Sequence, residues 1–204
     1  MAYDPEKHHR RSIRLPYYDY TGAGAYFVTL CTGGHRSLFG RIEGEEMRRA
    51  RPGVIADQCW RAIPTHFPQV ALDEFIVMPN HVHGIIWIMD APVDAAAHFV
   101  GATHASPLRD TAGMPHGPKQ RSLGAMIGSY KSAVSKRVRE IGGTPDRPIW
   151  QRNYFEHVIR NDVALHRIRQ YIVNNPSRWA YDRLNPLSTN PEPEDAWRPD
   201  QNAT

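Results

Sequence analysis

The sequence predicts a two-layer α+β domain in which helices pack on an antiparallel sheet. Segments rich in β-branched and aromatic residues alternate with segments whose apolar residues recur every three or four positions. Two of the β-rich runs are separated by Pro79 and Asn80, a pair typical of turns, so these two strands should be antiparallel neighbours. No internal repeat is present, and 204 residues suit one domain.

Composition favours an intracellular protein with a polyanionic partner. Lys and Arg number 25 against 21 Asp and Glu, which gives a net charge of +4 and a pI near 9.2. The two cysteines form no CxxC motif and are too few for a disulfide framework. No apolar run approaches the roughly 18 residues of a membrane span, and the N-terminus lacks the apolar segment of a signal peptide. We therefore expect a cytoplasmic, nucleoid-associated protein with no membrane partner.

The N-terminal third predicts a basic arm, two strands and a helix. Residues 1–20 form the expected arm, in which Arg11 is a candidate phosphate contact. A strand is expected over residues 25–31, and a second over residues 37–42 would pair with it in a hairpin across the glycines at 33–34. A helix follows, because Pro52 suits a first turn and apolar residues recur every four positions before Pro68: Ile55, Cys59, Ile63 and Phe67.

The central strands carry a histidine pair. His81 and His83 open the second of the two apolar runs in VALDEFIVMPNHVHGIIWIM. Residues 90–120 then lack any period and are rich in Ala, Gly, Pro and Thr, which predicts a mobile loop inserted in the domain.

The C-terminal part predicts a helix, a strand and a last helix. The first helix begins at Ser122 and ends at the glycines at 142–143, and basic residues lie off its apolar stripe: Lys131, Lys136, Arg137 and Arg139. A strand is expected over residues 149–159, and the last helix should begin near Asn161 and end before Pro176. We expect residues 181–204 to be a disordered tail, so the domain covers residues 21–180.

The histidine pair is a candidate metal site. Residues two apart on a strand point to the same face, so His81 and His83 place two imidazoles side by side, as a single cation requires. The pattern alone is weak, because a chain with 11 histidines forms such pairs by chance. Two strand histidines that only form hydrogen bonds remain the alternative interpretation.

Several ordered motifs together resemble one family. A His-hydrophobic-His pair after MPN, in a basic α+β chain with a tyrosine-bearing last helix, resembles the HUH nucleases. More narrowly, RRSIRLPYYDYTGAGAYFVTLCT, FIVMPNHVHGIIWI, WQRNYFEHVIRN and RIRQYIVNNPSRW resemble the REP-associated tyrosine transposases, relatives of the single-tyrosine insertion-sequence transposases. The resemblance covers residues 11–179 without the loop at 90–120.

The resemblance implies a ferredoxin-like two-layer sandwich with a central antiparallel sheet, the HUH nuclease fold. It implies that His81 and His83 hold Mg²⁺ or Mn²⁺, and that Tyr171 attacks a DNA phosphate to give a 5′-phosphotyrosine and a free 3′-hydroxyl. A polar residue one turn after the tyrosine, commonly Gln in the family, completes the metal shell, and here it is Asn175. The implied partner is single-stranded or hairpin DNA, in the form of a repetitive palindromic hairpin. A homodimer and a monomer are both left open.

Tyr171 is preferred to the other tyrosines as the nucleophile. Tyr171 and Asn175 are four residues apart and share one flank of the last helix, at the edge of its apolar stripe. The alternative role of Tyr171 is that of an amphipathic residue at the boundary between core and surface. Tyr130 lies in the middle of an apolar stripe, which favours a core role. An unperturbed phenol has a pKa near 10, so any nucleophilic tyrosine needs a cation or a base.

Six further residues are candidate DNA contacts. Lys131, Lys136 and Arg139 form a basic helix face, and the strand expected over residues 149–159 presents Trp150, Arg152 and Tyr154 on one side. Such a mixture suits base stacking and phosphate pairing, but ordinary cross-strand packing would use it as well.

Two other functions remain open. The first is a domesticated, catalytically inactive protein that binds hairpin DNA on the same fold. The second is a zinc protein unrelated to DNA, for which the histidines would need a further Cys or carboxylate ligand, and the neighbouring sequence offers none.

Overall fold

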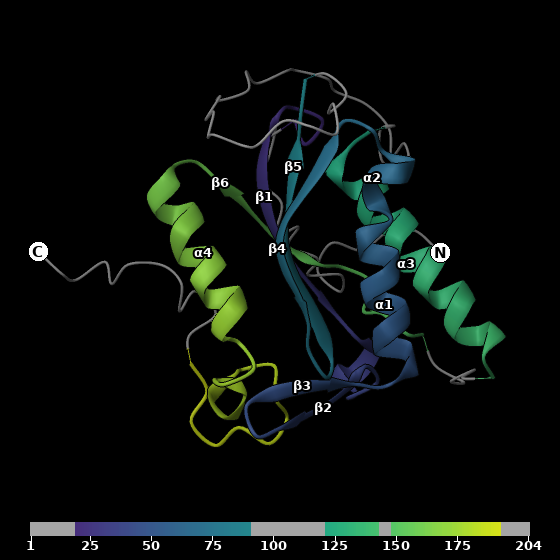
Figure 1. Ribbon diagram of the computed structural model, residues 1–204, viewed down its shortest axis with the longest axis vertical. Helices are drawn as coiled ribbons and strands as arrows, with labels where there is room; N and C mark the ends of the chain where they lie inside the picture. The colour runs from purple at the N-terminus through teal and green to yellow at the C-terminus, as the bar shows by residue number, and fades with distance from the viewer. Residues whose placement is uncertain (1–18, 91–120, 143–147, 193–204) are drawn as a thin grey trace, which may run out of the picture.

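A four-stranded sheet forms the centre of the molecule (Figure 1). The computed structural model describes residues 19–90, 121–142 and 148–192. Within them the sheet has the order β4-β5-β1-β6, and every neighbouring pair is antiparallel. Its members are β1 (Gly24–Cys31), β4 (Val70–Val77), β5 (His81–Ile88) and β6 (Phe155–Ile159). The predicted antiparallel pairing of the strands on either side of Pro79 and Asn80 is confirmed.

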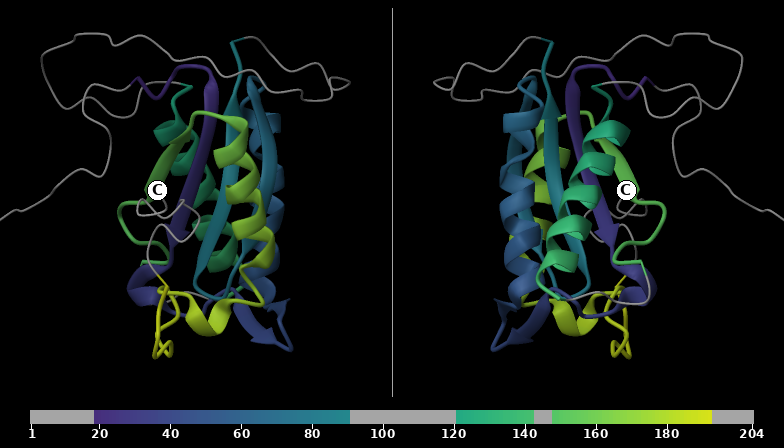
Figure 2. Two further views of the ribbon diagram at one scale, coloured as in Figure 1. Left: turned by 90° about the vertical axis from the view of Figure 1, so that its left-hand side faces the viewer. Right: turned by 90° about the vertical axis from the view of Figure 1, so that its right-hand side faces the viewer.

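Helices α1 (Arg51–Arg61) and α3 (Leu123–Glu140) cover one face of this sheet (Figures 1 and 2). The chain order β1-α1-β4-β5-α3-β6 with this strand order is the ferredoxin-like arrangement, so the predicted fold class is confirmed. Helix α4 (Asp162–Asn174) lies on the opposite face and adds a partial third layer (Figure 2). The sheet is therefore buried from both sides along its central strands.

Two hydrophobic cores result, one on each face. Alternate side chains of β1 serve them: Tyr26 and Val28 belong to the core under α1 and α3, while Phe27 belongs to the core under α4. Strand β5 is buried at every position, which explains why its sequence shows no alternation of apolar and polar residues.

Gly84 allows α1 to approach β5. A Cβ atom on Gly84 would lie 2.3 Å from the indole ring of Trp60, which is fully buried. The glycine that follows the histidine pair is thus required by packing on the α1 side, while His83 faces the α4 side.

The second strand was predicted with the wrong partner. Strand β2 (Gly40–Glu43) pairs with β3 (Glu46–Arg49), and the expected hairpin with β1 does not form. The glycines at 33–34 instead form a short 3-10 turn, η1 (Gly33–His35). The true hairpin turns at Gly44 and Glu45, with φ of 54° and 67°. Glutamate rarely adopts such values, so the turn left little signal in the sequence.

The strand expected over residues 149–159 was predicted too long. Strand β6 covers only Phe155–Ile159, and Trp150 forms an isolated bridge with Thr32. Backbone bonds join residues 149–151 to the end of β1, and the Lys131 ammonium binds the backbone carbonyls of Gln151 and Asn153. The segment is therefore an ordered loop that leads into β6.

The predicted helices are confirmed, with one division. Ser122 caps α3 and Asn161 caps α4, each accepting a hydrogen bond from the backbone three residues later. The expected helix from Pro52 to Phe67 is divided at Ala62 into α1 and the short α2 (Ile63–His66). Pro64 lacks an amide hydrogen, which accounts for the break.

Residues 181–192 differ from the expected disordered tail. Tyr181 is the last residue of a 3-10 turn, η2 (Trp179–Tyr181). An ion pair of Arg178 with Glu192 closes the residues after this turn into a loop. The rest of the expected tail, the N-terminal arm with Arg11 and the loop over residues 91–120 lie outside the described residues. None of the described helices is long and apolar enough to cross a membrane.

Candidate functional site

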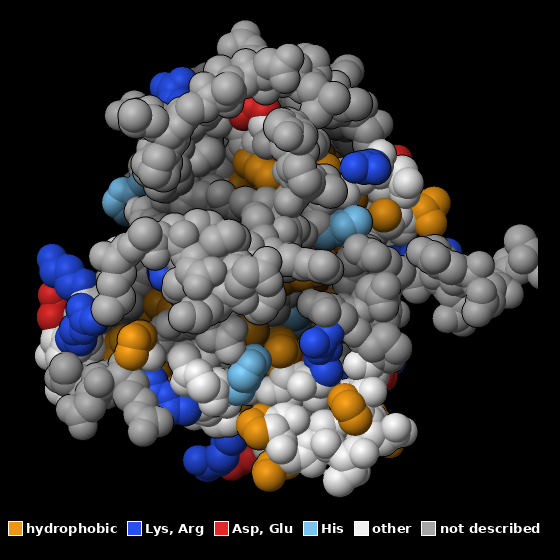
Figure 3. Space-filling model, turned by 180° about the vertical axis from the view of Figure 1, so that it is seen from behind, with side chains coloured by type: hydrophobic (Ala, Val, Ile, Leu, Met, Phe, Trp, Pro, Cys, Tyr) orange, Lys and Arg blue, Asp and Glu red, His pale blue; other side chains and the backbone are white. Residues whose placement is uncertain are grey.

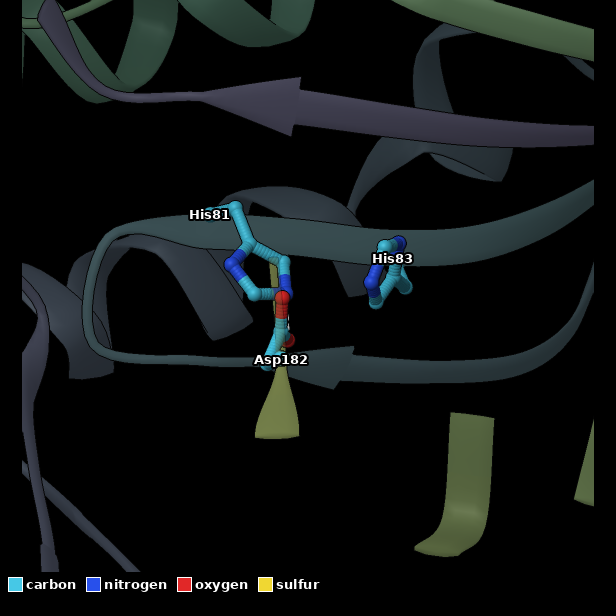
Figure 4. A group of neighbouring side chains, drawn as sticks. All are labelled: His81, His83 and Asp182. Atoms are coloured by element: carbon cyan, nitrogen blue, oxygen red, sulfur yellow. Dashed lines mark ion pairs between the residues drawn. The ribbon is translucent and has the colours of Figure 1, made fainter. Parts of the chain in front are cut away.

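The histidine pair lies in the centre of the sheet, on the face that carries α4. His81 and His83 are buried, and their ring centroids are 4.4 Å apart. Figure 4 shows both imidazoles extending from the start of β5. The prediction that the two side chains share one face is therefore confirmed.

A hydrogen bond to the neighbouring strand fixes the His83 ring. Thr29 stands opposite His83 in the β1–β5 register, and its Oγ1 lies 2.8 Å from His83 Nδ1. The second ring nitrogen, Nε2, is thereby directed toward α4. Burial lowers the pKa of His83 to about 3, so the imidazole is neutral at physiological pH.

The Asn80 carboxamide fixes the proton on His81. Asn80 Nδ2 donates to the carbonyl oxygens of His35 and Leu184, at 3.1 and 2.6 Å, so its Oδ1 must act as the acceptor. That oxygen lies 2.9 Å from His81 Nδ1, which therefore carries the hydrogen. His81 Nε2 is left with its lone pair, which is the form that binds a metal ion. Burial, followed by repulsion from His83, lowers the pKa of His81 well below its usual value.

Tyr171 reaches the same place from α4. Its hydroxyl oxygen lies 3.4 Å from His83 Nε2, and its ring packs edge-on against Phe27. Burial raises the pKa of Tyr171 above its usual value, so the phenol is protonated in the absence of a bound cation. Burial is the largest influence on the pKa values of His81, Tyr171 and Asp182. Asn175, which is buried one turn after Tyr171, opposes it in each case: its side chain raises the pKa of His81 and lowers the pKa values of Tyr171 and Asp182.

Asp182 is a site residue that the sequence analysis missed. Its Oδ2 lies 3.7 Å from His81 Nε2, and Figure 4 shows its carboxylate reaching His81 from the segment after α4. Burial raises the pKa of Asp182 to about 6. The prolines that follow residue 182 predict a disordered tail there, which the structure contradicts. The apolar residues Trp179, Tyr181 and Leu184 around it were the available signal of an ordered segment.

The donor atoms around this point fit a metal ion. One ligand atom each from His81, His83 and Asp182 lie within 4.8 Å of one another. Within the described part of the chain, His81 Nε2, Asn175 Oδ1 and Asp182 Oδ2 are buried without a hydrogen-bond partner. Buried polar atoms are normally paired, so unpaired atoms on His81 and Asp182, which lie 3.7 Å apart, and on Asn175, which interacts with both residues, indicate a place for a cation. Nitrogen and oxygen ligands suit several divalent ions.

An ion pair attaches α4 to the sheet. Arg169 Nε and Nη2 lie 2.8 and 2.6 Å from the two carboxylate oxygens of Asp73, and Trp87 Nε1 donates to the same group at 2.9 Å. Burial alone would raise the pKa of Asp73, but the hydrogen bonds from Arg169 and Trp87 lower it. Because Arg169 precedes Tyr171 by two residues, the pair holds the candidate nucleophile over β5.

Two of the candidate DNA contacts have structural roles. Trp150 is buried between Phe39 and Tyr130, with centroid distances of 5.2 and 5.6 Å. The Lys131 ammonium is bound to two backbone carbonyls, and burial lowers its pKa to about 8. Tyr130, the rival nucleophile, is also in the core, and its hydroxyl donates to the Ala56 carbonyl at 3.3 Å.

The remaining candidates are divided between the two faces. Lys136 and Arg139 are exposed on α3, across the sheet from the histidines. Arg152 is exposed and Tyr154 half-buried on the loop before β6, near the site. In Figure 3, the Lys and Arg side chains of the described residues lie in several separate groups on the face shown.

The fold has a counterpart among solved structures. The structure of a REP-associated tyrosine transposase bound to a REP hairpin matches 85% of this chain and 77% of its own, with a TM-score of 0.51 and 15% sequence identity. This likeness shows the shared fold. A buried group of two histidines and an aspartate that could hold a metal ion lies on that fold.

Sequence comparison places the chain in a family. It is 38% identical over 182 residues to a protein of Haemophilus influenzae described as uncharacterized, covering 89% of this chain and 96% of the relative. The chain belongs to the same family as this protein. No family model matches the sequence.

Proposed function

We propose that the chain is a metal-dependent enzyme that cleaves and rejoins single-stranded DNA through a covalent bond to Tyr171. The observation that carries the proposal is the position of the Tyr171 hydroxyl, 3.4 Å from Nε2 of His83, which lies together with His81 and Asp182 in a group that could hold a metal ion. A tyrosine in contact with a candidate cation site has the surroundings that a phenol nucleophile requires.

The proposed reaction exchanges one phosphate ester for another. The phenol oxygen of Tyr171 forms a bond to phosphorus, and the bond from phosphorus to the 3′ oxygen of the preceding nucleotide breaks. The phenol proton is lost and the departing 3′ oxygen gains one, so the products are a 5′-phosphotyrosine and a free 3′-hydroxyl. Attack by a 3′-hydroxyl on the phosphotyrosine reverses the exchange and joins a strand.

The residues of the site have separate tasks in this reaction. His81 and His83, both neutral, would bind Mg²⁺ or Mn²⁺ together with Asp182 and Asn175. The ion would neutralise phosphate charge and favour ionisation of the phenol, whose pKa is raised by burial and by the charge of Asp182. Thr29 and Asn80 keep the histidine rings oriented through their hydrogen bonds to Nδ1. The ion pair of Arg169 with Asp73 holds α4 against the sheet and so keeps the Tyr171 phenol in place.

Hairpin DNA is the proposed substrate. The solved structure with the same fold is bound to a REP hairpin, which makes a hairpin with single-stranded flanks the first substrate to test. The positive net charge of the chain agrees with a nucleic-acid partner.

Covalent-adduct formation tests the proposal. The full-length protein is incubated with end-labelled hairpin DNA carrying single-stranded flanks, in Mg²⁺, in Mn²⁺ or in a chelator, and is resolved on a denaturing gel. We expect a labelled protein band with either metal and none in the chelator. Tyr171→Phe should bind the DNA but form no adduct, because only the attacking oxygen is removed. His81→Ala should bind DNA and lose cleavage at limiting metal.

Tyr130→Phe is the matched control. It removes a hydroxyl from a tyrosine of the opposite core, which is more deeply buried than Tyr171, and costs about one hydrogen bond in stability, ~1 kcal/mol. We expect it to form the adduct. An adduct that persists in Tyr171→Phe would refute the assignment of the nucleophile. Binding without an adduct in the wild type, on every hairpin and with both metals, would favour an inactive hairpin-binding protein.

A further inference from the structure

A cavity of about 260 Å³ opens beside Tyr171 on the α4 face of the sheet. Strands β1 and β6 contribute Phe27 and Phe155 to its lining, and the loop before β6 contributes Gln151 and Tyr154. Because Tyr171 also lines the cavity, its occupant lies next to the candidate nucleophile. The volume is below the roughly 300–1,000 Å³ of pockets for drug-sized ligands, which limits the occupant to about one ring system.

The wall of the cavity suits a flat aromatic ligand. Phe27 contacts Phe155 and Tyr171 edge-on, with centroid distances of 6.3 and 6.2 Å. Phe155 and Tyr154 are only half-buried, so parts of their rings face the cavity. Aromatic side chains of this kind stack on unpaired nucleobases in single-strand binding proteins.

The Gln151 carboxamide supplies polar recognition at the same place. Its Nε2 lies 2.8 Å from His35 Nε2, a contact that uses one of the two amide hydrogens. The second hydrogen and Oε1 remain available as a neighbouring donor and acceptor, because the Gln151 side chain makes no other hydrogen bond within the described residues. A carboxamide with this pair matches the edge of adenine, which offers an amino donor beside a ring-nitrogen acceptor.

The loop that carries Gln151 is held in position before any ligand binds. Lys131 Nζ donates to the carbonyl oxygens of Gln151 and Asn153, at 2.9 and 3.0 Å. The backbone amide of Gln151 donates to the Cys31 carbonyl at 2.9 Å. Hydrogen bonds on both sides of the loop fix its conformation, so little conformational entropy is lost when a ligand binds.

We propose that this cavity binds one unpaired base, adenine in preference to the other bases, in a nucleotide that adjoins the phosphate attacked by Tyr171. The inference rests on the proposed function and adds to it a site that reads sequence at the point of cleavage. A base stacked in a duplex cannot enter the cavity, so the site would select single-stranded DNA. Gln151 would be a specificity residue, and Phe155 would provide the stacking surface.

A randomised substrate pool tests the base preference. Hairpins with random single-stranded flanks are incubated with the full-length protein and metal, and the DNA from covalent adducts is sequenced. We expect adenine to be enriched at one position bordering the cut, by at least about five-fold, the lower end of the effect of a two-point base contact. Gln151→Ala should abolish this enrichment. Gln58→Ala, which truncates an exposed glutamine on α1 across the sheet, should preserve it.

Abasic substrates separate this inference from the proposed function. If the wild type cleaves a hairpin equally well when each flanking nucleotide in turn is abasic, the cavity holds no base and the inference is wrong, while the proposed function stands. Adenine enrichment that is unchanged in a folded Gln151→Ala would refute the role of Gln151.

A fluorescence measurement tests the cavity without cleavage. Tyr171→Phe is titrated into hairpins that carry 2-aminopurine, an adenine analogue, at each flanking position in turn. We expect stacking to quench the fluorescence strongly at one position and Phe155→Leu, in the same background, to weaken that quenching. Equal quenching at all positions, or none that depends on Phe155, would refute the inference even if the protein proves to be catalytically inactive.

Discussion

At the scale of single residues, burial keeps the His83 imidazole neutral, and this couples stability to pH. The pKa of His83 is about 3 in the folded protein and near 6.5 when unfolded, so the unfolded state binds an additional proton between these values. Stability from this group is complete above pH 6.5 and is lost as the pH falls. His81 acts in the same direction, whereas Asp182, with its raised pKa of about 6, acts in the opposite one.

We therefore predict that His83→Gln is less sensitive to acid than the wild type. Between pH 7 and pH 5 in a chelator, His83 alone should cost the wild type about 2 kcal/mol of unfolding free energy, a loss that the variant avoids. Denaturant unfolding of both proteins at the two pH values measures this. Equal losses in the two proteins would show that His83 is not held neutral by burial.

Gly84 gives a second prediction at this scale. A methyl group at this position would overlap the buried Trp60 ring, so Gly84→Ala should destabilise the fold by about 1–3 kcal/mol. Gly128 is the control, because a Cβ there meets nothing within 4 Å on an exposed side of α3. Gly128→Ala should stabilise by about 0.5–1 kcal/mol through helix propensity. Thermal unfolding compares them, and equal effects would contradict the packing argument.

At the scale of elements, the position of α4 depends on a bond to an irregular part of β4. The register of β4 against β5 shifts between Leu72 and Phe75, and Asp73 lies within this bulge. A bulge redirects side chains, and here the Asp73 carboxylate is turned toward Arg169 on α4. The position of Tyr171 on α4 therefore depends on the ion pair between Arg169 and Asp73, which forms at the bulge in β4.

Asp73→Asn should lower the rate of adduct formation more than it weakens DNA binding. The substitution keeps an acceptor for Trp87 but removes the charge that holds Arg169, so the phenol loses its fixed position while phosphate contacts elsewhere remain. Single-turnover cleavage and equilibrium binding are the two measurements. Asp57→Asn breaks comparable ion pairs with Arg49 and Arg61 on the far face and should change neither. An equal effect of both variants would assign Asp73 to general stability.

The elements with strong local signals were predicted well. Helix α3 and helix α4 each have a capping side chain and a regular apolar stripe, and both begin where the sequence indicated. The errors fall where a distant residue determines the backbone. Lys131, far from residues 151–153 in sequence, binds two carbonyls of that segment, which leads into β6 as a loop, and β2 pairs with a strand that has almost no apolar residues.

At the scale of the whole molecule, the two faces of the sheet differ in the residues that they carry. The candidate site and its cavity lie on the α4 face, whereas the basic residues of α3 lie on the other face. Lys131, the member of that helix closest to the loop before β6, has its ammonium engaged with backbone carbonyls. Charges on the α4 side, among them Arg152, should therefore contribute more to DNA binding than those of α3.

We predict that affinity for hairpin DNA falls as salt rises and exceeds that for blunt duplex. Arg152→Ala should reduce the slope of log affinity against log salt by about 0.7, the value for one phosphate contact on a single strand. The double variant Lys136→Ala with Arg139→Ala should leave the slope unchanged. Titrations at several salt concentrations measure both, and the reverse ranking would place the DNA on the α3 face.

The residue patterns by themselves determined the α+β class, the antiparallel pairing of β4 and β5, and the shared face of His81 and His83, whereas the ferredoxin-like arrangement was implied by the family resemblance. These follow from local periodicity and turn residues, which need no knowledge of distant contacts. The tertiary structure alone decided that Asp182 joins the histidines and that Trp150 and Lys131 turn inward. It also decided that the cavity forms between β1, β6 and α4. Each of these depends on segments far apart in the chain being packed together, and no residue pattern within one segment records its partner.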